Sequence, residues 1–257
     1  MTWDRRSGTL HRARNAVNQL TARGIELPDS VAAAVAVLDR VQAAAPAPPK
    51  TTAVREAILA GADDSEIDRL LLADLAHTRL RSEHTQAVVI AAERVLAAVM
   101  AERDNLHAAL KVLAEHAIEQ LDRVASFDGA SLEELVRAGR HDDAKALAEV
   151  EVVGAELKAL YEIRDTYLTP GGPEARQAGH FDCSEFVDCR VGYRHHSIDR
   201  SVAGNYVYAL RQGAELHYPT AEEALAAAAP IYAAWERDAA RKAARQGEQY
   251  SSASALA

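Results

Sequence analysis

Apolar residues recur at helical spacing along an uninterrupted stretch from Ser65 to about Val124, which contains no Pro and no Gly. Its residues are mostly Ala, Leu, Glu, Arg and Gln, which favour helix. An acceptor cluster at Asp63–Ser65 can cap the first free N–H groups, and Gly129 follows the far end. The pattern predicts one long helix, weakest near residues 81–86, where apolar residues pause. At about 1.5 Å per residue, it would span roughly 90 Å.

The two halves of this stretch differ in their apolar pattern. The first half has a broad apolar face, typical of a helix packed in a bundle, that consists of Ile67, Leu70, Leu71, Leu75 and Leu80. The second half has apolar side chains at alternating spacings of three and four residues, as in a coiled-coil seam. Two interpretations remain open: burial among the chain's own helices, and self-association. The residues expected at a self-association interface are Val89, Leu96, Val99, Leu106, Leu110 and Leu113.

Shorter helices are predicted on both sides of the long one. Residues 1–45 form a helical hairpin in this interpretation, interrupted at Gly24 and Pro28. The Pro-rich segment 46–52 is typical of a linker, because consecutive prolines favour an extended chain. Residues 53–170 then form a bundle or coiled-coil domain around the long helix. Within it, the Ser131–Glu134 capping box opens a returning helical pair.

The pattern changes after Pro173. Apolar and polar residues alternate along Asn205–Tyr218, which predicts a β-hairpin. A second capping box, Thr220–Glu223, begins a helix that Pro230 is expected to kink or split. Residues 174–246 therefore predict a small α+β unit of ββα type, and 247–257 a frayed, flexible tail. The predicted fold class is mainly α: a long central helix, helical hairpins and this C-terminal ββα unit.

The composition favours an acidic helical protein. Hydrophobic residues make up 49% of the 257 residues but aromatic residues only 5%, and the formal net charge is −9. An acidic chain is repelled by nucleic acid overall, so a nucleic-acid partner is not expected. The exception is an arginine-rich N-terminus, which is either a solvated helix face or a nucleic-acid contact. Its candidate contact residues are Arg5, Arg6, Arg12 and Arg14.

The apolar runs are too short to span a bilayer, and no charged-then-apolar leader opens the chain. The sequence therefore predicts a cytoplasmic protein without a membrane partner, or a virion protein if a phage encodes it.

Four residues that can ligate zinc lie close together after Pro173. They are His180, Cys183, Cys189 and His195. Two thiolates and two imidazoles can complete a tetrahedral zinc shell. However, Cys-x5-Cys matches no common zinc-finger spacing, and free structural cysteines are the simpler interpretation. No cofactor is therefore expected, and zinc is the alternative.

Common catalytic motifs are absent from the sequence: it has no Walker A loop, no Gly-x-Ser-x-Gly elbow and no His-Glu-x-x-His. A Cys183 or Cys189 pair with His195 remains an alternative, although nothing supplies its oxyanion side. We therefore expect a non-enzymatic structural or assembly protein, an oligomer-forming helical scaffold whose partners are itself and other proteins. A phage virion or capsid-assembly component fits such a chain by analogy. The alternatives are a metal- or thiol-dependent binding module in 174–218 and a nucleic-acid-associated factor using the arginine-rich N-terminus.

Overall fold

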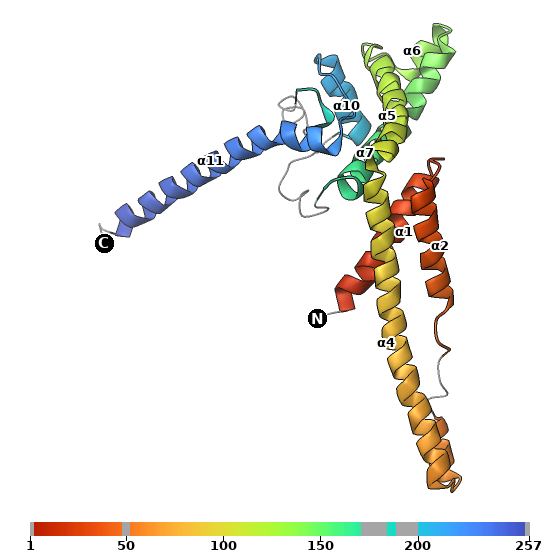
Figure 1. The fold of residues 1–257 in the computed structure, drawn as a ribbon. Helices are drawn as coiled ribbons and strands as arrows, with labels where there is room; N and C mark the ends of the chain where they lie inside the picture. Colours follow the sequence, from red (N-terminus) through yellow and green to blue (C-terminus); the bar gives the residue numbers. More distant parts are fainter. Residues whose placement is uncertain (1–2, 48–51, 171–183, 189–199, 255–257) are drawn as a thin grey trace. The chain divides into compact units, whose positions relative to one another are not determined.

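The computed structural model describes residues 3–47, 52–170, 184–188 and 200–254. These parts of the chain are mainly helical, which confirms the predicted mainly α fold (Figure 1). The chain divides into two compact units, Met1–Glu102 and Arg103–Ala257. The sequence had placed a boundary at the Pro-rich segment 46–52 instead. Each unit has its own apolar core.

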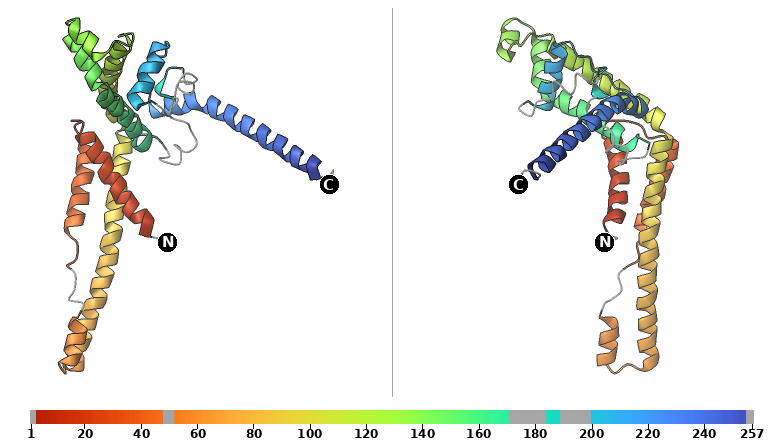
Figure 2. Two further views of the ribbon diagram at one scale, coloured as in Figure 1. Left: turned by 180° about the vertical axis from the view of Figure 1, so that it is seen from behind. Right: turned by 90° about the vertical axis from the view of Figure 1, so that its left-hand side faces the viewer.

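The first unit contains four helices: α1 (Trp3–Thr21), α2 (Asp29–Ala43), α3 (Ala53–Leu59) and α4 (Asp64–Ala101). Helices α1 and α2 pack against the second half of α4, and α3 lies beside its first half (Figure 2). Small residues allow the close helix contacts, since alanine leaves the backbones free to approach. The buried core consists of Ala13, Val17, Leu38, Ala91, Ala92 and Val95.

The predicted single helix over 65–124 is wrong at Glu102. Helix α4 ends at Ala101, and α5 (Arg103–Ala125) begins immediately afterwards. At Glu102 the backbone has φ −94° and ψ 13°, outside the helical range. The polar run Glu102–Asn105 includes Asp104 and Asn105, which favour helix starts over helix interiors. No break occurs at residues 81–86, where the apolar pattern pauses.

The second unit is built on α5, α6 (Leu132–Arg137), α7 (His141–Tyr167), α10 (Val202–Arg211) and α11 (Ala221–Ser254). Helices α5, α7 and α10 pack against one another, and α6 packs on α7. The Ser131 hydroxyl accepts from the Glu134 N–H, and the Glu134 carboxylate accepts from the Ser131 N–H, so the predicted capping box starts α6. The large buried side chains of this core include Leu106, Leu110, Leu121, Leu157 and Leu160.

The predicted ββα unit is wrong: residues 202–211, which include most of the expected first strand, form the helix α10. Ala203, Tyr206 and Val207 are buried in it at helical spacing, whereas Tyr208 and Leu210 of the alternating pattern are only partly buried. The Ser201 hydroxyl caps the helix by accepting from the Gly204 N–H. The described residues of this region contain one isolated β-bridge, Phe186–Leu216, and no strand.

The last helix, α11, begins at the predicted Thr220–Glu223 capping box, in which each residue's side chain accepts from the other's backbone N–H. It continues through Pro230 as one helix instead of splitting there, and it reaches Ser254, where a frayed tail was expected.

Candidate functional site

Several of the most exposed apolar side chains among the described residues lie on α3 and the first half of α4. Leu72 and Leu75 are each 66% exposed, and Leu59 is 81% exposed. Monomeric proteins expose single apolar side chains freely, but a continuous row of leucines marks an interaction surface more often. We call this set the α3–α4 leucine surface. It consists of Ile58, Leu59, Leu71, Leu72, Leu75 and Leu80.

The opposite side of α4 explains why these leucines are left exposed. Ile67, Leu70 and His77 are partly buried, and they share one side of the helix, where the chain's own elements lie. Further along that side, His84 Nε2 lies 2.7 Å from the Val41 carbonyl oxygen. One side of α4 is thus covered by its own unit, whereas Leu72 and Leu75 on the other side have no covering element in the described part of this unit.

The six predicted interface residues do not form one seam, because the break at Glu102 divides them between α4 and α5. Val99, Leu106 and Leu110 are at most 1% exposed, so their own units already cover them. Leu96 packs against the core of the first unit, and Val89 and Leu113 are partly buried. The apolar pattern therefore identifies helix faces correctly, but the exposed apolar face lies in the first half of α4, before the six predicted residues.

The arginine-rich N-terminus lies on α1. The Arg14 guanidinium donates to the Asp39 carboxylate and the Gln42 side-chain oxygen of α2, and Arg12 is partly buried. Arg14 thus joins α1 to α2, which leaves less of its charge for a phosphate. The side chains of Arg5 and Arg6 lie outside the described part, so the nucleic-acid prediction is not tested by them.

The predicted zinc ligands His180, Cys183, Cys189 and His195 all lie outside the described residues. Among the residues that the structure does describe, no three His, Cys, Asp or Glu side chains form a group that could hold a metal ion. The zinc hypothesis therefore remains a prediction.

A buried polar network occupies the second unit, and the sequence analysis did not predict it. The Arg164 side chain of α7 is 0% exposed; its Nε donates to Asp165 Oδ1 at 2.7 Å. One terminal nitrogen donates to the Ser184 hydroxyl at 3.2 Å, and the guanidinium lies over the rings of Tyr161 and Tyr218. A buried guanidinium is costly unless it is paired in this way. Arg164 thus joins α7 to two segments that follow it in the chain.

Glu185 is the second charged member of this network. Its carboxylate accepts from Lys158 Nζ at 2.8 Å and from the Tyr206 hydroxyl at 2.7 Å. The Tyr161 hydroxyl donates to the His217 carbonyl oxygen at 2.7 Å, and burial, followed by the nearby Glu185 charge, raises the pKa of Tyr161 well above its usual value. Because these groups bond to one another, the network holds residues 184–188 against α7.

A shallow pocket of about 460 Å³ lies beside this network, between α5 and the segment that leads into α11. His217 is on its wall, and burial lowers the pKa of this imidazole, so the neutral form is favoured there. Backbone and hydroxyl hydrogen bonds from Thr220 lower the pKa of Glu223. Glu223 is held by its helix cap, and Lys111 on the same wall is paired with Glu115 at 3.7 Å.

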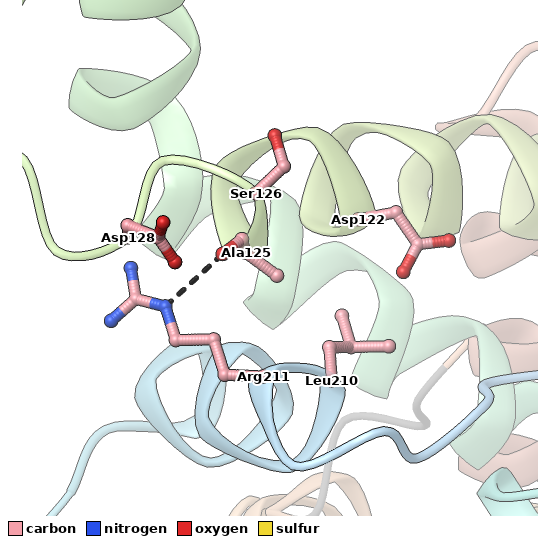
Figure 3. A pocket seen from close by; sticks show the side chains of 6 residues that line it. All are labelled: Asp122, Ala125, Ser126, Asp128, Leu210 and Arg211. Carbon is pink, nitrogen blue, oxygen red and sulfur yellow. Dashed lines mark hydrogen bonds between the residues drawn. The ribbon is translucent and has the colours of Figure 1, made fainter.

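A second pocket, also about 460 Å³, lies between the end of α5 and the end of α10 (Figure 3). Arg211 Nε donates to the Ala125 carbonyl oxygen at 3.2 Å, where a cation suits the helix C-terminus. Burial, followed by the Glu215 charge, raises the pKa of Asp122. This pocket is an open depression, and the hydrogen bond between Arg211 and Ala125 borders it.

No known protein family, curated protein or solved structure matches the chain.

Helix α4 is the one described helix that is long and apolar enough to cross a membrane, judged by length and composition. Its buried residues all lie in the second half, where α1 and α2 pack on Ala91, Ala92, Val95 and Val99. The core of the first unit explains the apolar character of that half only in part, since 22% of the apolar 18-residue window is buried.

The sequence analysis missed Leu72, although it counted Leu71, Leu75 and Leu80 in the bundle-like apolar face. The signal that could have identified Leu72 is its spacing of three residues from Leu75 on a helix whose opposite side is also apolar. One short helix, α3, covers only one of these two sides.

Proposed function

We propose that this chain is a non-enzymatic helical assembly protein that self-associates through the α3–α4 leucine surface. The observation that carries the proposal is the exposure of Leu72 and Leu75, on a helix whose other side is already packed. Exposing these leucines to water is unfavourable in free energy, and contact with a second protein surface removes that cost.

The size of the exposed surface sets the expected strength of association. Burying two leucines from each of two chains contributes about 4–8 kcal/mol, allowing for the part that is already covered. Association itself costs on the order of 4–15 kcal/mol in lost translational and rotational freedom. The flanking residues Ile58, Leu59, Leu71 and Leu80 must therefore contribute as well. We expect a weak, reversible complex, and the test below covers dissociation constants of order micromolar.

The internal use of polar groups also supports a structural role. In the second unit, the hydroxyls of Tyr161, Tyr206 and Tyr218 donate to carbonyl or carboxylate oxygens of the same unit. These hydrogen bonds stabilise the unit, and each of the three hydroxyls donates within the fold. A role in phage or virion assembly is a finer form of this proposal and rests on analogy alone.

Sedimentation velocity of the full chain tests the proposal, over a range from about 1 to about 100 µM. The wild-type chain is expected to shift from monomer to a heavier species across this range. The Leu72→Glu/Leu75→Glu variant is expected to remain monomeric, because association would bury two carboxylates per chain.

The matched control is Val112→Glu/Val152→Glu, which makes the same chemical change at two exposed valines of the second unit, 66% and 72% exposed. It is expected to associate like wild type. A wild-type chain that stays monomeric at the highest concentration contradicts the proposal, as does a leucine variant that associates normally.

A further inference from the structure

The outward side of α4 carries a regular stripe of six exposed residues. They are Ser65, Asp68, Leu72, Leu75, Arg79 and Ser82. Their spacings of three, four, three, four and three are those of a coiled-coil seam, so the six side chains share one narrow face of the helix. Neither α3 nor α2 covers this face, since all six residues are exposed. We call this set the α4 stripe.

The positions of the α4 stripe are symmetric about the point between Ala73 and Asp74. Leu72 and Leu75 lie at equal distances from this point, and so do Ser65 and Ser82. At the intermediate positions the symmetry relates opposite charges, Asp68 and Arg79. A helix that meets an identical, reversed helix at this point therefore places each residue of the stripe level with its symmetry mate.

We propose that the surface that covers the α4 stripe is a second copy of this chain, with its α4 antiparallel and centred between Ala73 and Asp74. Leu72 then lies level with the partner's Leu75. Asp68 lies level with the partner's Arg79, and the twofold symmetry forms each of these contacts twice. This inference rests on the proposed function and specifies the partner, the direction and the register.

Charge distinguishes this arrangement from the parallel one. A parallel, in-register pair of α4 helices sets Asp68 against the partner's Asp68 and Arg79 against the partner's Arg79. Like charges at a contact oppose association, and opposite charges steer it. Arg79 is now paired with Glu83 of its own helix at 3.0 Å, but both side chains are well exposed, 80% and 62%. Breaking this exposed Arg79–Glu83 pair to form the contact with the partner's Asp68 therefore costs little free energy.

The rest of the leucine surface lies at the edges of this contact. In the proposed register, Leu80 lies level with the partner's Ile67 and Leu71 with the partner's Ala76, each near the border of the stripe. The α3 residues Ile58 and Leu59 are also exposed, on the helix that packs beside the same half of α4.

Charge reversal in the full chain tests the pairing. Asp68→Arg sets two arginines against each other at both ends of the contact, and Arg79→Asp sets two aspartates there. Each single variant is expected to raise the dissociation constant about tenfold or more. The double variant Asp68→Arg/Arg79→Asp restores opposite charges and is expected to self-associate with a dissociation constant close to that of wild type.

Mixing gives a second, independent readout. Equal amounts of the two single variants are expected to form a heterodimer, because each supplies the charge that the other needs. The control is Arg69→Asp, which makes the same charge change on the same helix, about a quarter-turn away from the stripe. It is expected to associate like wild type. Circular dichroism confirms that each exposed-site variant keeps its helix content.

The outcomes separate this inference from the proposed function. If wild type self-associates, the leucine variant does not, and both single charge variants behave like wild type, the antiparallel register is overturned and the assembly function stands. The same holds if the double variant stays as weak as the singles. If wild type stays monomeric, or binds phospholipid vesicles instead of itself, both proposals are overturned.

Discussion

Arg164 and Ser131 show which single residues can be understood from the sequence alone. The Ser131 cap was predictable, because its partner Glu134 is three residues away and the contact is set by helix geometry. Arg164 was not, because its partners include the Ser184 hydroxyl and the Pro219 carbonyl oxygen. An arginine within a helix is usually solvated, and nothing local to α7 distinguishes this one. Long-range burial is the information that a single sequence does not contain.

Replacing Arg164 with methionine is expected to destabilise the second unit by about 3–5 kcal/mol, because it removes the guanidinium that pairs with the buried Asp165. Urea unfolding of the full chain, followed by circular dichroism, measures the change. The control is Arg137→Met, which removes an exposed pair with Glu133 and is expected to cost less than about 1 kcal/mol. Equal unfolding midpoints for the two variants would refute the structural importance of the network.

At the scale of elements, helix positions were easier to predict than helix type or continuity. Capping boxes and glycines at Gly24 and Gly139 define helix ends, and both glycines have positive φ in the structure, 71° and 72°. The error at α10 has a different origin. Its ten residues are too few to separate a period of two from a period of 3.6, and the segment's buried tyrosines resemble strand residues. The break at Glu102 lacks any glycine or proline signal.

Helix α7 approaches α10 closely at Gly154. A Cβ on Gly154 would lie 2.6 Å from Ala203 Cβ and 2.7 Å from its Cα. Alanine is the better helix former by about 1 kcal/mol, but the neighbouring backbone of α10 has to move to admit it. At this position the close contact decides the outcome.

Gly154→Ala is therefore expected to destabilise the second unit, by about 1–3 kcal/mol. Gly8→Ala in α1 is the matched control, since a Cβ there meets no atom within 4 Å. The control is expected to be neutral or slightly stabilising, up to about 1 kcal/mol. Thermal unfolding of both variants measures the difference. A stabilised Gly154→Ala variant would show that the α7–α10 contact is looser than described.

At the scale of the whole molecule, each unit buries its own core, and the principal exposed apolar surface belongs to the first unit. The sequence indicated self-association through apolar helix faces, and that prediction remains open. It placed the contact on residues that the structure divides between two units and largely buries. The α4 stripe is exposed because α4 extends well beyond the part that α1 and α2 cover (Figure 2). How far a helix extends past its packing partners depends on tertiary structure, which the periodicity does not give.

Hydrogen–deuterium exchange of the wild-type chain, compared at concentrations well below and well above its dissociation constant, locates the contact directly. Amides from Ser65 to Ser82 are expected to exchange more slowly in the concentrated sample, because association suppresses local opening of this half of α4. Amides of α7 are expected to exchange equally in both samples. Identical exchange along α4 at the two concentrations, or protection that appears elsewhere in the chain, would contradict self-association through the leucine surface.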